Sequence, residues 1–198
     1  MALINEILAP RAYEPIRERI GAILTLELLN QAAITYDDDL LVDVYNERSK
    51  PIQPDECPAV NVILAKGDFD NQTIISEDGS YQFMIDCYCT SATTDIDRGD
   101  SLASFKSQRL AGVCMAILEH PLYHVLGFTP PFIIRNQVTG FEVGEPDRSE
   151  STNMTLTRIS LSVKASQDEP TQTGVELALS LTQVKIALTD KGYQYEIS

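Results

Sequence analysis

Two histidines, His120 and His124, have the i, i+4 spacing that places two imidazoles on one side of a helix, as zinc sites require. Pro121 lies between them and disfavours a regular helix there. No third ligand is close to them in the sequence. We therefore predict a turn that closes the preceding helix, and no metal ion at this position.

Cys87 and Cys89 form a Cys-x-Cys pair. On a strand both thiols would lie on one face about 7 Å apart, which does not suit a normal disulfide. A zinc site would need further sulfur ligands, and only Cys57 and Cys114 remain. We predict that Cys87 and Cys89 are small residues of the core.

Asp95, Asp97 and Asp100 resemble the start of a calcium-binding loop. Such a loop needs Gly at its sixth position and Glu at its twelfth, where this sequence has Asp100 and Lys106. Acids here also suit the start of a helix, because they cap free N–H groups and complement the helix dipole. We therefore predict that Asp95 or Asp97 caps a helix.

Charge and motif content exclude several classes of function. With 15 basic and 29 acidic residues the formal net charge is −14, whereas proteins that hold nucleic acid use clustered Lys and Arg. The sequence contains no P-loop, no G-x-G-x-x-G and no G-x-S-x-G motif. We predict a protein that is not an enzyme, with no catalytic residues, no cofactor and no metal.

The sequence shows no apolar run near the length of about eighteen residues that a membrane span needs. Residues 1–9 also lack the pattern of a signal peptide. We therefore expect a protein that is produced in the cytoplasm and does not bind membranes.

Hydrophobic periodicity predicts the elements that position these residues. Apolar residues at spacings of three and four predict one helix over residues 14–31 and a second that ends before Pro121. The clearest strand starts at Tyr81, where odd positions are apolar as far as Cys89. Further strands are expected at residues 40–45, 59–65, 132–145 and 153–165.

This order of elements favours an α+β fold for residues 1–165. We predict a mixed, largely antiparallel sheet with two main helices packed on one face. Residues 166–174 contain no apolar residue and are typical of a linker. Residues 175–198 alternate as a C-terminal β arm, with a phase slip at Thr182 and Gln183 that indicates a bulge or two strands. Such an arm cannot bury both its faces alone, so we expect it to pack on the main domain or on a neighbouring subunit.

Three stretches of the sequence carry a recognisable pattern. They are residues 44–52 (VYNERSKPI), residues 58–62 (PAVNV), and residues 117–123 (ILEHPLY) with 126–128 (LGF). Together they resemble the tail terminator proteins of tailed bacteriophages, the minor tail protein U type. The resemblance spans residues 16–165.

The resemblance implies a structural virion protein at the head-proximal end of a phage tail. Members of this family form a ring, usually a hexamer, that caps the tail tube, ends its polymerisation and joins the tail to the head connector. The implied partners are further copies of the chain, the tail tube protein and a head-tail connector or neck protein. Genomic DNA would pass through the ring without specific binding.

Two acidic segments are the candidate sites within this interpretation. Residues 66–80 form a long loop or an open hairpin connection, and we predict that they contact the tail tube. A lumen lined by carboxylates would repel DNA phosphates. The candidate tube contacts are Asp68, Asp70, Asn71, Glu77 and Asp78, and the candidate lumen residues are Asp37, Asp38 and Asp39. A solvated surface loop is the alternative for each of them, and the run of three aspartates could also chelate magnesium.

Two other interpretations of the whole chain remain open. One is a different phage neck or connector adaptor protein, or a baseplate component. The other is a small-molecule-binding or enzymatic α+β domain, which would have a dominant apolar pocket with converging polar groups and would be monomeric.

Overall fold

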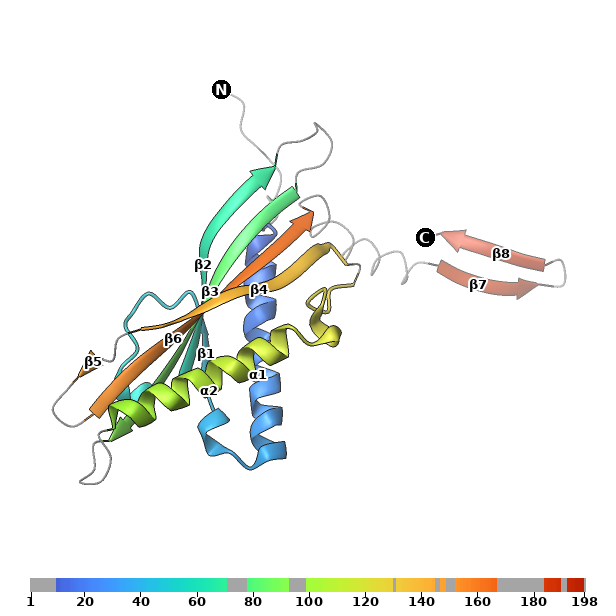
Figure 1. Cartoon of the computed structure of the whole chain (residues 1–198). Helices are drawn as coiled ribbons and strands as arrows, with labels where there is room; N and C mark the ends of the chain where they lie inside the picture. The colour runs from blue at the N-terminus through green and yellow to red at the C-terminus, as the bar shows by residue number, and fades with distance from the viewer. Residues whose placement is uncertain are drawn as a thin grey trace.

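The computed structural model describes residues 10–70, 78–92, 99–129, 131–144, 147–148, 152–166, 184–189 and 192–197. Its main body is an open sheet with two long helices, which cross each other in Figure 1. The predicted α+β fold is therefore confirmed. Neither helix is long and apolar enough to cross a membrane, in the part of the chain that the structure describes.

The sheet has the strand order β1-β2-β3-β6-β4 (Figure 1). These strands are β1 (Asp43–Asn46), β2 (Ala59–Asp70), β3 (Asp78–Ala92), β6 (Thr152–Ser166) and β4 (Ile133–Val143), and the short β5 (Asp147–Arg148) also pairs with β6. β1 is parallel to β2, and every other pair is antiparallel. The sheet is thus mixed and largely antiparallel, as the sequence predicts.

The two helices are α1 (Tyr13–Thr35) and α2 (Asp100–Leu118). α1 is longer than predicted at both ends, and it stops where Tyr36 adopts a left-handed conformation and its N–H bonds to the carbonyl of Ala32. The N-cap of α2 is Gly99, with φ +48° and no side-chain cap. The N-cap residue of α2 is therefore not Asp95 or Asp97, and that prediction is wrong. Asp95 and Asp97 themselves lie outside the described residues.

One core lies between the helices and one face of the sheet. The odd-numbered residues of β3 from Tyr81 to Cys89 are buried in it, because side chains alternate across a strand. Leu24 of α1 and Leu110 of α2 belong to the same buried cluster, so both helices cover this face. Where α2 crosses β6, the buried Ser107 and Thr157 hydroxyls bond to each other at 2.9 Å.

Two predicted boundaries differ in the structure. The strand expected at residues 40–45 begins only at Asp43, because a 3-10 turn, η1 (Asp38–Leu40), precedes it. The described parts of segment 66–80 are strand: β2 continues to Asp70 past a bulge between Leu64 and Lys66, and β3 starts at Asp78. β2 and β3 pair antiparallel, which agrees with the hairpin alternative, and residues 71–77 between them lie outside the described residues.

The C-terminal residues that the structure describes are β7 (Val184–Thr189) and β8 (Gly192–Ile197), which pair antiparallel in a sheet of two strands. The predicted linker at residues 166–174 lies outside the described residues apart from Ser166, the last residue of β6. The expected strand before Thr182 also lies outside them.

Candidate assembly surfaces

Three of the five residues predicted to contact a tail tube lie at one end of the β2–β3 hairpin. Asp70 lies opposite Asp78 in the strand register. The Asp68 carboxylate is 2.8 Å from the Lys66 ammonium, and that of Asp78 is 3.2 Å from Lys164. Asn71 and Glu77 lie outside the described residues. The structure thus brings Asp68, Asp70 and Asp78 together, and it pairs two of them with lysines.

Two of the candidate lumen residues attach η1 to α2. Asp37 pairs with Arg109 and Asp39 with Lys106, each at 2.7 Å. Asp37 also accepts a hydrogen bond from the N–H of Asp39, which caps the 3-10 turn. These two acids therefore have a structural role that the run of aspartates did not indicate. Asp38 is exposed, and a place in a lumen stays a prediction for all three.

The turn predicted around the histidines is confirmed. α2 ends at Leu118, and a 3-10 turn, η3 (Pro121–Tyr123), follows it. The imidazole Nδ1 of His120 accepts a hydrogen bond from the N–H of Leu122, so this ring caps the turn. In the described part of the chain, no three His, Cys, Asp or Glu residues gather as metal ligands would.

Cys87 and Cys89 are buried core residues, as predicted, and Cys114 is buried with them. The pKa of Cys57 is raised to about 11 and that of Cys89 to about 12, mainly because both thiols are shielded from water. Nearby acids, Glu56 and Asp55, raise the pKa of Cys57 further.

Alkylation should therefore distinguish the folded from the unfolded protein. A thiol with a pKa near 11 is only about a thousandth thiolate at pH 8, and the thiolate is the reactive form. We expect iodoacetamide to modify Cys57 slowly and Cys89 hardly at all in native buffer at pH 8, and to modify all four cysteines in concentrated urea. Mass spectrometry of timed samples measures this. Rapid native modification of Cys89 would show that the core opens easily.

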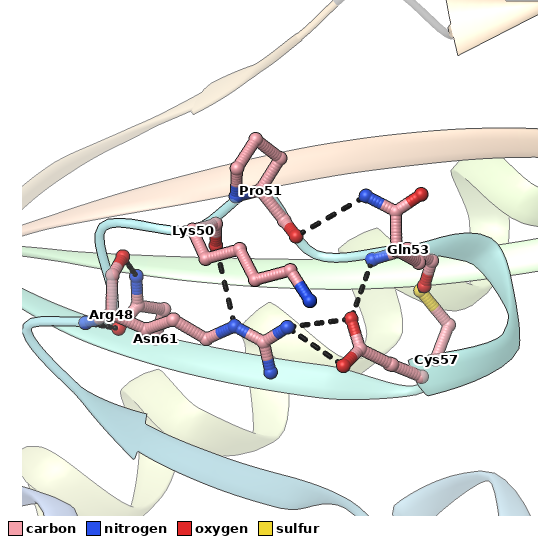
Figure 2. Close-up of polar contacts among 7 residues, drawn as sticks. Arg48, Lys50, Pro51, Gln53, Cys57 and Asn61 are labelled. Carbon is pink, nitrogen blue, oxygen red and sulfur yellow. Dashed lines mark hydrogen bonds and ion pairs between the residues drawn. The ribbon is translucent and has the colours of Figure 1, made fainter.

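Two of the stretches behind the family resemblance meet through polar contacts of Arg48, Glu56 and Asn61, which we call the clasp (Figure 2). The Asn61 side chain bonds to both backbone groups of Arg48, accepting from its N–H at 3.1 Å and donating to its carbonyl at 3.0 Å. The Arg48 guanidinium donates to both carboxylate oxygens of Glu56 at 2.7 Å, and it stacks on the ring of Tyr45. These bonds from Arg48, with one from the Gln53 N–H, lower the pKa of Glu56. The clasp therefore has a structural role.

Beside the clasp, the sheet face that points away from the helices carries an ion pair whose carboxylate is buried. Asn61, Asp86 and Arg158 occupy one row across β2, β3 and β6. The side chain of Asp86 is 1% exposed, although it lies on the face of the sheet that the helices do not cover. The guanidinium of Arg158 bonds to its two oxygens at 2.7 and 2.8 Å. This pair is a second structural contact that composition and spacing did not predict.

The outer face of α1 is unusually apolar for a surface helix. Leu26 is 68% and Ile34 is 62% exposed, and Leu29 and Tyr36 are exposed as well. Among residues 22–36, all of them described, none of the exposed side chains is charged. A helix that is hydrophobic on all sides is usually buried. We call the exposed side chains of residues 22–36 the α1 face.

A groove runs along each side of the α1 face. The first, about 580 Å³, lies between α1 and α2. Its apolar and small lining residues are Gly112, Val113, Ala116, Ile117 and Leu122, and Asn30 and Gln31 are among its polar ones. The second, about 440 Å³, lies between α1 and the segment around Pro58. The α1 face is thus a ridge between two hollows.

The first groove also contains a polar contact. The Tyr123 hydroxyl donates a hydrogen bond to the Glu27 carboxylate, which raises the pKa of Tyr123 and lowers the pKa of Glu27. Asn30 donates to the same carboxylate at 3.2 Å. The hydrogen bonds to Glu27 therefore satisfy its carboxylate. Arg109, which also lines this groove, pairs with Asp37.

The opposite flank of the molecule ends in a free strand edge. β4 is the last strand of the sheet and, among the described residues, pairs only with β6. Phe141 and Val143 face the helix side, since they lie opposite the buried Ile159 and Thr157. Phe141 is nevertheless 56% exposed. An unpaired edge with exposed apolar side chains is a surface that other chains can extend.

Sequence reasoning did not single out either the α1 face or the β4 edge as a surface. The signal for the α1 face is present, because residues 20–35 contain one charged residue, Glu27, and have apolar residues outside the core stripe. Comparison with known proteins adds no assignment: no family model matches the chain and no curated protein matches its sequence. The surfaces themselves must therefore carry the functional argument.

Proposed function

We propose that this chain is a structural virion protein that assembles head-to-tail into a ring, of six subunits if it follows the family it resembles. The ring would cap the tail tube of a bacteriophage, end its polymerisation and join the tail to the head connector. One observation carries the ring: two exposed apolar surfaces lie on opposite flanks, the α1 face over β1 and β2 and the free edge at β4.

Opposite placement matters because it determines the symmetry of association. Two different surfaces that bind each other make a heterologous contact, which closes into a ring or continues as a filament. A single self-complementary surface would give a twofold dimer instead. The identity of the ring as a tail terminator comes from the sequence resemblance at residues 44–52, 58–62 and 117–128.

Light scattering over a concentration series, with and without purified tail tubes, tests the proposal. We expect a single closed oligomer, visible as a ring by negative-stain microscopy, and labelling of tails at the head-proximal end. A closed ring that binds elsewhere in the virion would favour the alternative of a neck or connector adaptor. A mass that stays at one chain under all conditions would contradict the ring. A monomer would direct attention to the groove between α1 and α2, where Glu27, Tyr123 and His120 converge, as a small-molecule site.

The acidic end of the β2–β3 hairpin gives a second prediction. Changing Asp68 and Asp78 to Asn, together with Asp70→Asn and Glu77→Gln, should leave the fold intact, because exposed ion pairs contribute at most about 1 kcal/mol each. If these residues contact the tube, we expect tails of abnormal length or impaired DNA ejection. Electron microscopy of tails and infectivity assays measure both. The control changes Glu18 and Glu119, two exposed acids elsewhere, to Gln. Normal tails and normal infectivity in the hairpin variant would refute the contact.

A further inference from the structure

We propose that the α1 face of one subunit packs against the β4 edge of the next, with Phe141 entering the neighbour's groove between α1 and α2. This inference rests on the proposed ring and names the two surfaces that would form it. The occupant of the α1 face is then a second copy of this chain.

The first argument is electrostatic. Two chains of net charge −14 repel each other, so copies approach most easily where neither surface carries acids. The α1 face has no exposed charge. At the end of β4, Phe141 and Val143 point to the helix side, whereas Glu142 lies opposite Arg158 on the other face of the sheet. The ridge of α1 and the helix side of the β4 end are therefore uncharged. In the groove that Phe141 would enter, the Glu27 carboxylate already accepts hydrogen bonds from Tyr123 and Asn30, and Arg109 pairs with Asp37.

The second argument is shape and hydrogen bonding. A groove of about 580 Å³ is large enough to receive an aromatic side chain with room to spare. The apolar and small residues that line the groove suit the ring of Phe141. Leu122, one of these lining residues, is 71% exposed. An edge strand also presents unpaired N–H and C=O groups. The amides of Asn30 and Gln31, which line this groove, can both donate to and accept from such groups.

The dimensions of the two surfaces agree. The fourteen helical residues 22–35 extend about 21 Å. Six strand residues, 138–143, extend about 20 Å. The exposed length of α1 therefore corresponds to the half of the β4 edge that carries Val138, Phe141 and Val143, and the groove between α1 and α2 widens the contact.

Matched serine substitutions test the contact. Phe141→Ser should weaken ring formation at least tenfold, as loss of an aromatic anchor does at protein interfaces. Phe105→Ser removes an aromatic ring of similar exposure, 63%, from the outer side of α2 and should leave assembly unchanged. Melting temperatures within a few degrees of the wild type would show that both variants fold. Ring formation by Phe141→Ser at wild-type strength would overturn the inference.

Cross-linking decides which surfaces meet. In a Cys57→Ser background, chains with Ala33→Cys are mixed with chains with Val143→Cys and treated with a short bis-maleimide. We expect covalent dimers from this mixture, and none from Ala33→Cys alone or from Ala33→Cys mixed with Gln82→Cys, which lies on the far face of the sheet. Dimers from Ala33→Cys alone would mean that α1 packs on α1, and the inference would be wrong.

The results separate the inference from the proposed function. A ring without the expected cross-link would reject the α1–β4 contact and leave the ring intact. The contact would also be rejected if Leu26→Asp left the ring intact but abolished tail binding, since the α1 face would then bind the tube. A wild-type chain that stays monomeric with and without tubes would reject both.

Discussion

Replacing Arg158 with Met should lower the free energy of unfolding by about 3 kcal/mol. Arg158 donates hydrogen bonds to both oxygens of the buried Asp86 carboxylate. Without the guanidinium, the donor that remains among the described side chains is the Tyr88 hydroxyl, 3.4 Å away. A buried carboxylate would then be almost unpaired, which costs much more than an exposed one. Met keeps most of the apolar stem of Arg, so lost packing contributes little.

The matched control is Lys164→Met. Lys164 lies on β6 and on the same face as Arg158, and its substitution breaks the ion pair with Asp78 of β3. Both of its side chains are partly exposed, so we expect a loss below about 1 kcal/mol. Urea unfolding monitored by circular dichroism measures both variants. Equal losses for the two would show that burial of Asp86 does not matter. A loss near zero for Arg158→Met would indicate that water or the nearby loop satisfies the carboxylate.

The position of Asp86 shows where sequence reasoning stops. The alternation from Tyr81 to Cys89 predicts the core face of β3 correctly, because strand geometry is local and has a period of two. The same alternation places Asp86 on the other face, which is expected to be exposed. It is buried by contacts with residues distant in sequence, such as Arg158. Periodicity carries no information on which distant segment covers an outer face.

The acidic runs show the same limit for candidate sites. The run of aspartates at residues 37–39 indicates a lumen wall or a solvated loop. In the structure Asp37 and Asp39 pair with Arg109 and Lys106, about 70 residues later in the chain. Spacing could not reveal these partners, since they meet only when α2 packs beside η1. The histidines and the Cys-x-Cys pair were interpreted correctly, because local rules about proline and strand distance decided them. Local chemistry could thus be predicted, and pairing across the fold could not.

The α1 face illustrates a different gap. The core stripe of α1 was predicted from the spacing of Ile16, Ile20 and Leu24, and all three are buried. Leu26 and Ile34 lie outside that stripe, and their exposure depends on α2 covering only one side of α1. A surplus of apolar residues in a helix therefore indicates a further partner only once the fold shows which side is already covered.

Changing Asn61 to Asp should destabilise the protein by about 3 kcal/mol at neutral pH, although the two side chains have nearly the same shape. One oxygen could still accept the Arg48 N–H. The other would replace the amide that donates to the Arg48 carbonyl, so two acceptors would face each other. Asn61 is also directly opposite Asp86 in the register, which places two buried carboxylates side by side.

The loss should become smaller in acid, and the sign follows from proton binding. Burial and the neighbouring Asp86 would raise the pKa of the new carboxyl above its value in the unfolded chain, about 3.9. Between these two pKa values the folded state binds more protons than the unfolded state, so stability relative to the wild type falls as the pH rises. Urea unfolding at pH 7 and at pH 4.5 measures the difference. Gln82→Glu, at an exposed position of the same face, is the control and should cost less than about 0.5 kcal/mol at either pH. A penalty for Asn61→Asp that is equal at both pH values would show that the new carboxyl is solvated, and that the clasp opens to admit water.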